Sequence, residues 1–227
     1  MPPPWPTATV SSWSGPLPEA DLAGRRLYLC TPDRPDLAAF LAACLRGGVD
    51  IVQLRDKDLE ARPLLARAAV AAAVCADFGV PFILNDRPDL ALACDAGGVH
   101  VGQDDTPPEV ARRILGPGAI IGFSTHAPAE WDAAAGSTAD YLSAGPVTST
   151  PTKPGRPGTG LGYLSYAAAS GEARPWFVTG GVTPDEIPAL VEAGARRFVV
   201  VRYLTTAAEP EAAARRLRHS IEAAIPG

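Results

Sequence analysis

The sequence has no cysteine pair of the kind that binds zinc or exchanges disulfides. Its four cysteines form no Cys-x-x-Cys motif, and none lies beside a histidine at the spacing of metal ligands. We interpret them as small buried apolar residues, which predicts reduced thiols and a cytoplasmic protein. They are Cys30, Cys44, Cys75 and Cys94.

The sequence also lacks long hydrophobic runs and an excess of basic residues. The longest apolar run, residues 68–76, is far shorter than the roughly 20 residues that cross a bilayer. The first residues lack the basic start and apolar middle of a signal peptide. The formal net charge of −5 argues against a nucleic-acid partner, since such a protein usually presents a basic face. Small anionic substrates remain compatible, because a few local cations can bind a phosphate.

Residues 1–24 are rich in proline and show neither a strand period nor a helix period. Six prolines fall within the first 18 residues, and no Lys or Arg precedes Arg25. This composition predicts an extended or disordered tail. The remainder, residues 25–227, is expected to form one catalytic domain.

From Arg26 onward, short runs rich in Val, Ile and Leu alternate with alanine-rich helical stretches. Most of the runs are apolar without alternation, as in parallel strands that are buried on both faces. Eight such β-then-α units predict a single (β/α)8 TIM barrel. The competing fold is an open doubly wound sheet, but no Gly-x-Gly-x-x-Gly turn follows the first strand. The expected strands are residues 27–30, 51–55, 82–85, 98–102, 120–125, 141–145, 176–180 and 197–201.

One helix start is marked by a capping signal. Thr106 is followed by Pro107 and, three residues after the threonine, by Glu109. This order predicts a capping box with Thr106 as N-cap and Pro107 at the first helical position.

Basic and amide side chains lie at the end of the second expected strand. Gln53, Arg55 and Lys57 share one side if the strand geometry continues. Cations that point inward are costly unless they meet an anion, and a diphosphate suits them. The alternative is a solvated strand end whose cations pair with Asp56 and Asp58.

Two carboxylates stand at the tips of the next two strands. Asp86 follows Asn85, and Asp105 follows the fourth strand. Carboxylate oxygens together with substrate phosphates suit an octahedral Mg²⁺, which takes few protein ligands. The alternative is helix capping by either aspartate.

The later strand ends carry further polar groups. Ser124 and His126 end the fifth strand, where they could contact a substrate or, for the serine, cap a helix. The long connection 146–160 has four prolines and no acidic residue, and it carries Thr150, Thr152 and Lys153. We interpret it as a lid that closes over a bound phosphate, the alternative being a disordered surface loop. Two glycines follow the seventh strand. They and the residues at the end of the eighth strand suit phosphate binding through backbone N–H groups.

Two histidines have simpler interpretations. His100 lies in the middle of an expected strand and is interpreted as a core histidine with its hydrogen bonds satisfied. His219 is expected on the surface of the last helix.

Taken together and in order, these motifs resemble the thiamine-phosphate synthase family. The resemblance spans residues 26–224. It rests on Gln53-Leu54-Arg55-x-Lys57, Asn85-Asp86, Gly102-Gln103-x-Asp105, Ser124-x-His126, Gly145-Pro146, Thr150-x-Thr152-Lys153 and Gly180-Gly181. It implies a (β/α)8 barrel, one Mg²⁺ per subunit, and two small phosphorylated heterocycles as substrates. These are 4-amino-2-methyl-5-(diphosphooxymethyl)pyrimidine and 4-methyl-5-(2-phosphooxyethyl)thiazole or its carboxylate, which yield thiamine phosphate and diphosphate.

The resemblance also implies roles for individual residues. The pyrimidine diphosphate would be bound by Gln53, Arg55, Lys57, Asn85, Ser124 and Lys153, of which Arg55, Lys57, Ser124 and Lys153 would be catalytic. Mg²⁺ would be held by Asp86 and Asp105. The thiazole phosphate would be bound by Thr150, Thr152, Gly181, Val201 and Arg202. The chain departs from the family where many members have serine in place of Arg202, which the bulky Tyr203 follows.

Three other functions fit parts of the pattern. A thiazole tautomerase of the same superfamily has no diphosphate to hold, so the full set of cations and carboxylates argues against it. A non-catalytic binder of phosphorylated ligands would not need the metal. A sugar-phosphate isomerase would need an acid–base pair that the sequence does not display. The sequence leaves the oligomeric state open, a homo-oligomer included.

Overall fold

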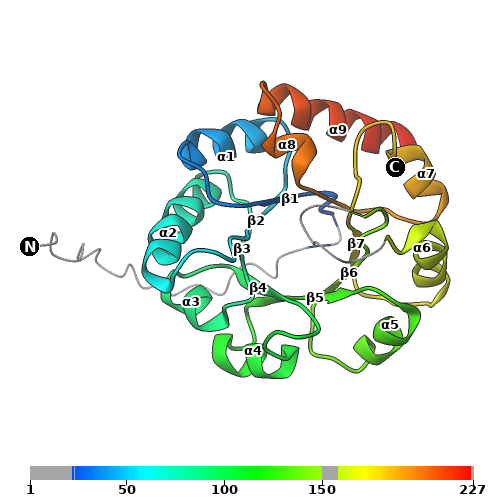
Figure 1. Ribbon diagram of the computed structural model, residues 1–227, viewed down its shortest axis with the longest axis horizontal. Helices are drawn as coiled ribbons and strands as arrows, with labels where there is room; N and C mark the ends of the chain where they lie inside the picture. Colours follow the sequence, from blue (N-terminus) through cyan, green and yellow to red (C-terminus); the bar gives the residue numbers. More distant parts are fainter. Residues whose placement is uncertain (1–21, 23, 150–157, 226–227) are drawn as a thin grey trace, which may run out of the picture.

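The computed structural model describes residues 22, 24–149 and 158–225, which form a closed barrel of eight parallel strands inside a ring of helices (Figure 1). The expected (β/α)8 fold is therefore confirmed. The strands are β1 (Leu27–Thr31), β2 (Ile51–Leu54), β3 (Phe82–Asn85), β4 (Gly98–Val101), β5 (Ile120–Thr125), β6 (Tyr141–Ala144), β7 (Trp176–Val178) and β8 (Phe198–Val200). The helices are α1 (Leu37–Arg46), α2 (Ala61–Asp77), α3 (Pro88–Ala93), α4 (Pro108–Leu115), α5 (Pro128–Ala134), α6 (Gly160–Ala169), α7 (Ile187–Glu192), α8 (Arg202–Thr205) and α9 (Pro210–Ala224).

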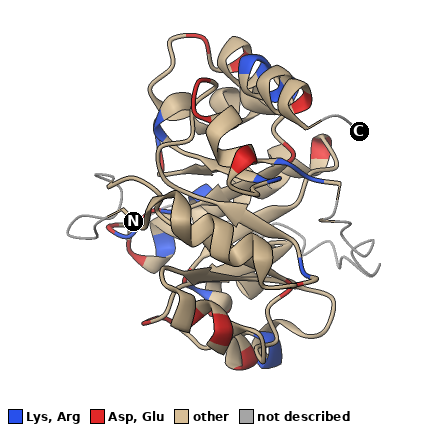
Figure 2. Ribbon diagram, turned by 90° about the vertical axis from the view of Figure 1, so that its right-hand side faces the viewer, with Lys and Arg blue, Asp and Glu red and all other residues tan. Residues whose placement is uncertain are grey.

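Each strand pairs in parallel with its neighbours in chain order, and β1 pairs with β8 to close the ring. All carboxyl ends of the strands therefore meet at one end of the barrel. Charged residues lie mainly on the surrounding helices and loops, with both signs interspersed (Figure 2). Among the described residues, no helix is long and apolar enough to cross a membrane.

The core has two parts because alternate strand residues point to opposite sides of the barrel wall. Leu29 and Val52 face the helices and belong to the large cluster between strands and helices. The smaller cluster fills the barrel interior and consists of Leu22, Tyr28, Ile51, Ile83, Ile120, Tyr141 and Phe177. Its aromatic rings meet edge to face, with the Phe177 ring 5.4 Å from those of both tyrosines between centroids.

The expected N-terminal tail lies mostly outside the described residues, which begin at position 22. Leu22 itself is 6% exposed and packs against the interior cluster of the barrel. This residue of the proline-rich segment is therefore part of the core.

The predicted capping box at Thr106 is wrong. Helix α4 begins at Pro108, its N-cap residue is Pro107, and no side chain caps it. The reason is that a residue before a proline is disfavoured in the helical region. Pro107 precedes Pro108 and is extended, with φ −56° and ψ 144°.

All four cysteines are free thiols, as expected. Burial raises the pKa of Cys44 and of Cys75 to about 12. These two thiols stay protonated at neutral pH and act as small apolar side chains.

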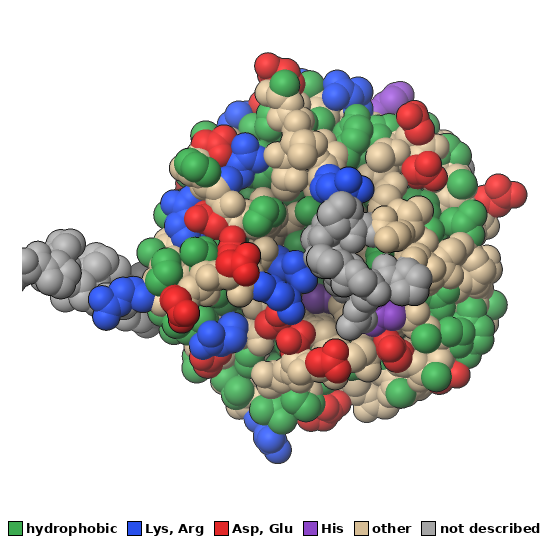
Figure 3. Space-filling model, in the orientation of Figure 1, with side chains coloured by type: hydrophobic (Ala, Val, Ile, Leu, Met, Phe, Trp, Pro, Cys, Tyr) green, Lys and Arg blue, Asp and Glu red, His purple; other side chains and the backbone are tan. Residues whose placement is uncertain are grey.

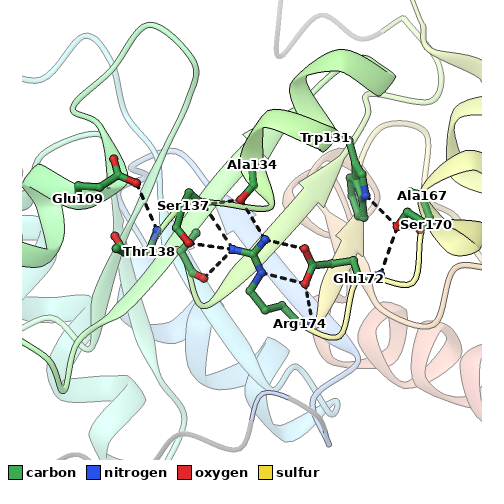
Figure 4. Close-up of polar contacts among 10 residues, drawn as sticks. Glu109, Trp131, Ala134, Ser137, Thr138, Ala167, Ser170, Glu172 and Arg174 are labelled. Carbon is green, nitrogen blue, oxygen red and sulfur yellow. Dashed lines mark hydrogen bonds and ion pairs between the residues drawn. The ribbon is translucent and has the colours of Figure 1, made fainter.

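The end of the barrel opposite the strands' carboxyl ends is held together by Arg174, which lies just before β7 (Figure 4). Its guanidinium pairs with Glu172 and donates to the carbonyl oxygens of Ala134, Ser137 and Ala139 at 3.0–3.2 Å. The first of these carbonyls ends α5 and also accepts from the backbone N–H and the hydroxyl of Ser137, so Arg174 joins the end of this helix to the loop that follows it.

We expect Arg174→Ala to lower the free energy of unfolding by about 2–3 kcal/mol, because the carbonyl oxygens of Ser137 and Ala139 lose this donor and Glu172 loses its ion-pair partner. The melting temperature should fall by roughly 5–10 °C for a domain of this size. Arg87→Ala is the matched control, since Arg87 also pairs with an acid two residues on, Asp89, but both are exposed. Its loss should stay below about 1 kcal/mol. Stability is measured by urea and thermal denaturation. Equal losses of stability in Arg174→Ala and Arg87→Ala would contradict this role of Arg174.

Candidate active site

A cavity of about 800 Å³ opens at the carboxyl ends of the strands. In the described part of the chain, each strand or the loop that follows it contributes to its lining. Figure 3 shows Lys or Arg, Asp or Glu, and His side chains close together near the centre of one face of the molecule. Polar, charged and apolar residues all line the cavity, and Tyr28 of the interior aromatic cluster is among them.

The floor of the cavity holds buried polar side chains. Gln53, Asn85 and Ser124 are only 4–9% exposed, and all three line the cavity. Buried polar groups are costly without hydrogen bonds, and Gln53 Nε2 accordingly donates to Tyr28 Oη at 2.8 Å. Ser124 Oγ lies 2.8 Å from His100 Nε2.

Three cations of the described segments also line the cavity. Lys57 Nζ lies 2.8 Å from Asp86 Oδ2, so this lysine is paired with a carboxylate and remains half exposed. Arg55 and Arg202 also line the cavity, and neither forms an ion pair with any described residue. The predicted alternative, in which Asp56 and Asp58 neutralise the basic strand end, is therefore wrong for Arg55.

Asp86 and Asp105 form an acidic pair beside these cations. The two carboxyl groups are close enough for Asp105 to raise the pKa of Asp86. Burial raises the pKa of Asp86, and the Asp105 carboxyl raises it further, whereas Lys57 lowers it. Asp86 also has a φ of 61°, a backbone conformation that few residues other than glycine adopt and that often marks functional sites.

Neither aspartate caps the helix that follows it, since α3 and α4 have no side-chain cap. Asp105 Oδ2 instead accepts the Gly102 N–H at 2.9 Å, which orients its carboxylate. Two crowded, partly buried carboxylates, only partly compensated by one lysine, fit an oxygen-preferring divalent cation.

One contact ties the loop of Asp105 to β5, and a second fixes His126 just after this strand. Gln103 Nε2 donates to the Ser124 carbonyl at 2.7 Å, which links the loop of Asp105 to the serine. The Glu130 carboxylate accepts the backbone N–H of His126 and lies 2.9 Å from its Nδ1. These contacts hold His126 at the cavity wall.

Glycines after β7 form another part of the wall. Gly180 and Gly181 both have positive φ, 88° and 77°, and line the cavity. A Cβ at Gly181 would lie 2.3 Å from Thr148 Oγ1, and one at Gly180 would lie 2.5 Å from Pro146 Cβ. The loops after β6 and β7 therefore pack so closely that only glycine fits.

Comparison with known proteins identifies the family of this site. The profile of the family described as thiamine monophosphate synthase matches residues 27–204. The chain belongs to this family. A thiamine-phosphate synthase from Mycobacterium bovis is 49% identical over 219 residues, which cover 91% of this chain and 99% of the relative. One from Thermus thermophilus is 49% identical over 201 residues, covering 86% and 97%.

A solved structure gives the same result. Thiamine phosphate pyrophosphorylase from Pyrococcus furiosus superposes with a TM-score of 0.79 at 29% identity, covering 88% of this chain and 96% of that chain. Family membership and these relatives confirm the expected function, that of a thiamine-phosphate synthase and hence a transferase, over the tautomerase and the non-catalytic binder.

The site predicted from sequence is largely brought together in one cavity. Ten of the expected residues line it: Gln53, Arg55, Lys57, Asn85, Asp86, Asp105, Ser124, Gly181, Val201 and Arg202. Thr150, Thr152 and Lys153 lie outside the described residues.

Sequence reasoning missed the polar residues under the cavity floor. Tyr28 and Tyr141 escaped notice, and His100 was interpreted as a core residue. The interpretation is correct in that both ring nitrogens of His100 have partners, but the ring also lines the cavity. The available signal was Gly122, because a glycine inside a buried strand often marks the close approach of another group.

Proposed function

We propose that this cavity condenses the diphosphooxymethyl pyrimidine with the phosphooxyethyl thiazole, or its carboxylate, and releases diphosphate and thiamine phosphate. The observation that supports this most directly is the Asp86–Asp105 pair beside Lys57, in a cavity that Arg55 also lines without an ion pair to any described residue. A site with adjacent carboxylates and nearby cations suits a diphosphate that is accompanied by a divalent metal ion.

The pyrimidine subsite is assigned to the cavity floor. Gln53, Asn85 and Ser124 would bind the heterocycle and the first phosphate, since their polar atoms are buried and face the cavity lining. Arg55 and Lys57 would bind the diphosphate oxygens, the arginine through its two-pronged guanidinium. Lys153 would join them from outside the described residues.

Asp86 and Asp105 would hold one Mg²⁺. Mg²⁺ prefers oxygen ligands and commonly binds proteins through one or two carboxylates, with waters and phosphate oxygens completing its shell. When bound, it would supply positive charge to the departing diphosphate. Asp105 is oriented for this by the Gly102 N–H, and Lys57 neutralises part of the charge of Asp86.

The residues suit a reaction in which the C–O bond to diphosphate breaks first. Negative charge then accumulates on the leaving group, and Arg55, Lys57 and Lys153 stabilise it electrostatically. The thiazole nitrogen attacks the resulting pyrimidine-methyl cation. This step needs no general base, so the absence of an acid–base pair among the expected site residues is consistent with it.

The thiazole phosphate subsite is assigned to the other wall of the cavity. Gly181 and Val201 would offer backbone N–H groups, and Arg202 a guanidinium with no ion partner among the described residues. Thr150 and Thr152 would complete it from outside the described part. If the thiazole is carboxylated, CO2 leaves as well.

A coupled assay for released diphosphate tests the proposal. We expect release only when the pyrimidine diphosphate, the thiazole phosphate and Mg²⁺ are all present. Omission of each in turn, with EDTA replacing Mg²⁺, is the control set. Release without the thiazole would indicate hydrolysis instead of condensation, and turnover undiminished by EDTA would contradict the metal assignment.

A further inference from the structure

A chain of hydrogen bonds crosses the barrel beneath the cavity floor and involves five strands. It begins at Gln53 on β2, whose Nε2 donates to Tyr28 Oη on β1 at 2.8 Å. The Tyr28 and Tyr141 hydroxyl oxygens are 2.9 Å apart. Tyr141 Oη on β6 lies 2.9 Å from His100 Nδ1 on β4, and His100 Nε2 lies 2.8 Å from Ser124 Oγ on β5. Both ends of the chain, Gln53 and Ser124, are cavity residues.

A gap in β5 makes room for the middle of this chain. Gly122 lies in register with both His100 and Tyr141. A Cβ at Gly122 would lie 2.3 Å from the Tyr141 hydroxyl oxygen and 2.4 Å from His100 Nδ1. The glycine therefore leaves the space through which the hydroxyl reaches the imidazole.

The hydrogen atoms along the chain can be ordered from its Gln53 end. The Cys30 thiol donates to Gln53 Oε1 at 3.1 Å, which turns Nε2 toward Tyr28. Burial raises the pKa of both tyrosines, so both hydroxyls keep their hydrogen. Tyr28 accepts from Gln53, so its own hydrogen is directed at Tyr141, its other hydrogen-bond partner among the described residues, and the hydrogen of Tyr141 is then directed at His100 Nδ1.

An imidazole that accepts at Nδ1 carries its hydrogen on Nε2. His100 therefore donates to Ser124 Oγ. Ser143 Oγ also donates to this oxygen, at 3.3 Å. Both acceptor positions of the Ser124 hydroxyl are thus occupied from the protein side, and its own hydrogen is left for the cavity.

We propose that Tyr28, Tyr141 and His100 are positioning residues that fix the Nε2–H tautomer of His100 and thereby hold Ser124 as a hydrogen-bond donor toward the bound heterocycle. The ligand atom that fits is an acceptor, such as an unprotonated ring nitrogen. The identity of that heterocycle as the pyrimidine rests on the proposed function, whereas the hydrogen order does not.

The first test is the tautomer itself. The chain has three histidines, so ¹⁵N-detected long-range correlation spectra of the ligand-free protein can be assigned with single His100→Gln, His126→Gln and His219→Gln variants. We expect the His100 pattern of an Nε2–H tautomer in the wild type. A wild-type Nδ1–H tautomer would mean that the chain runs in the opposite direction and would overturn the proposal without any further variant.

The second test removes one hydroxyl. Tyr141→Phe keeps the ring but deletes the donor to His100 Nδ1, and we expect a mixture of tautomers. Tyr163→Phe is the matched control, because its hydroxyl also makes a buried hydrogen bond, 2.7 Å to Thr125 Oγ1 on the same strand as Ser124. Tyr163 is not part of the hydrogen-bond chain, so Tyr163→Phe should leave the tautomer of His100 unchanged.

The third test is kinetic. We expect Tyr141→Phe to lower kcat/KM for the pyrimidine diphosphate about tenfold, the scale of one ordered hydrogen bond, and to leave KM for the thiazole phosphate unchanged. Tyr163→Phe should change neither. Where Tyr141→Phe fails to fold, Tyr28→Phe serves, since it deletes the preceding hydroxyl of the same chain.

The outcomes separate this inference from the proposed function. Equal effects of Tyr141→Phe and Tyr163→Phe, on the spectra or on kcat/KM, overturn the positioning role. A wild type that shows the Nε2–H tautomer but never releases diphosphate contradicts the proposed function and leaves the hydrogen order standing.

Discussion

Asp86→Asn is expected to lower kcat about a thousandfold, since removing one group that stabilises charge in a transition state costs up to about 4 kcal/mol. The asparagine keeps the size of the side chain and tolerates the φ of 61°. It removes the charge that would hold Mg²⁺ and that pairs with Lys57. The half-exposed lysine should be solvated in the variant, so folding stability should change by less than about 1 kcal/mol.

Asp95→Asn is a closely matched control for this variant. Asp86 and Asp95 are the described residues other than glycine with positive φ, and Asp95 is exposed and outside the cavity. Steady-state diphosphate release and thermal denaturation should be measured for both. Mg²⁺ should raise the melting temperature of the wild type and of Asp95→Asn but not of Asp86→Asn. Equal losses of activity and stability in Asp86→Asn would instead indicate a structural role.

Arg55→Lys is expected to lower kcat/KM for the pyrimidine diphosphate about a hundredfold, because the ammonium keeps the charge but loses the paired N–H donors of the guanidinium. Arg55 forms no ion pair with a described residue, so the fold does not depend on its charge. Arg55→Lys should therefore weaken turnover and substrate binding but leave the melting temperature unchanged.

The same substitution on the outer surface controls for the loss of arginine as such. Arg113 is exposed on α4, away from the cavity, and Arg113→Lys should retain full activity. Arg55→Lys with wild-type kcat and KM would mean that charge alone suffices at this position, or that the diphosphate binds elsewhere.

The barrel could be predicted because its strands are uninterrupted apolar runs that end in polar residues. Arg55, Asp86 and Ser124 are far apart in sequence, yet each follows or ends a strand, and closure of a parallel barrel brings such positions together. The expected strands run one or two residues too far at several ends, since the backbone leaves the ladder where the polar residues begin. Thus β2 ends at Leu54 and β7 at Val178.

The hydrogen-bond chain beneath the cavity floor could not be predicted in the same way. Tyr28 and Tyr141 lie in apolar strands and look like core residues, which they also are. Their hydroxyls meet because of the register across the barrel and the space left by Gly122, and neither is encoded by local periodicity. The glycine is visible in the sequence, but only the closed barrel shows that the Tyr141 hydroxyl and the His100 ring occupy the space beside it.

The pairing between β1 and β8 has a consequence for synthesis of the chain. Leu27 and Leu29 pair with Phe198 and Val200, so one edge of β1 lacks its partner until β8 has left the ribosome. An unpaired strand edge offers N–H and C=O groups to other chains and invites aggregation. A nascent or truncated chain that stops before residue 198 therefore exposes two open sheet edges, and the addition of β8 removes both at once.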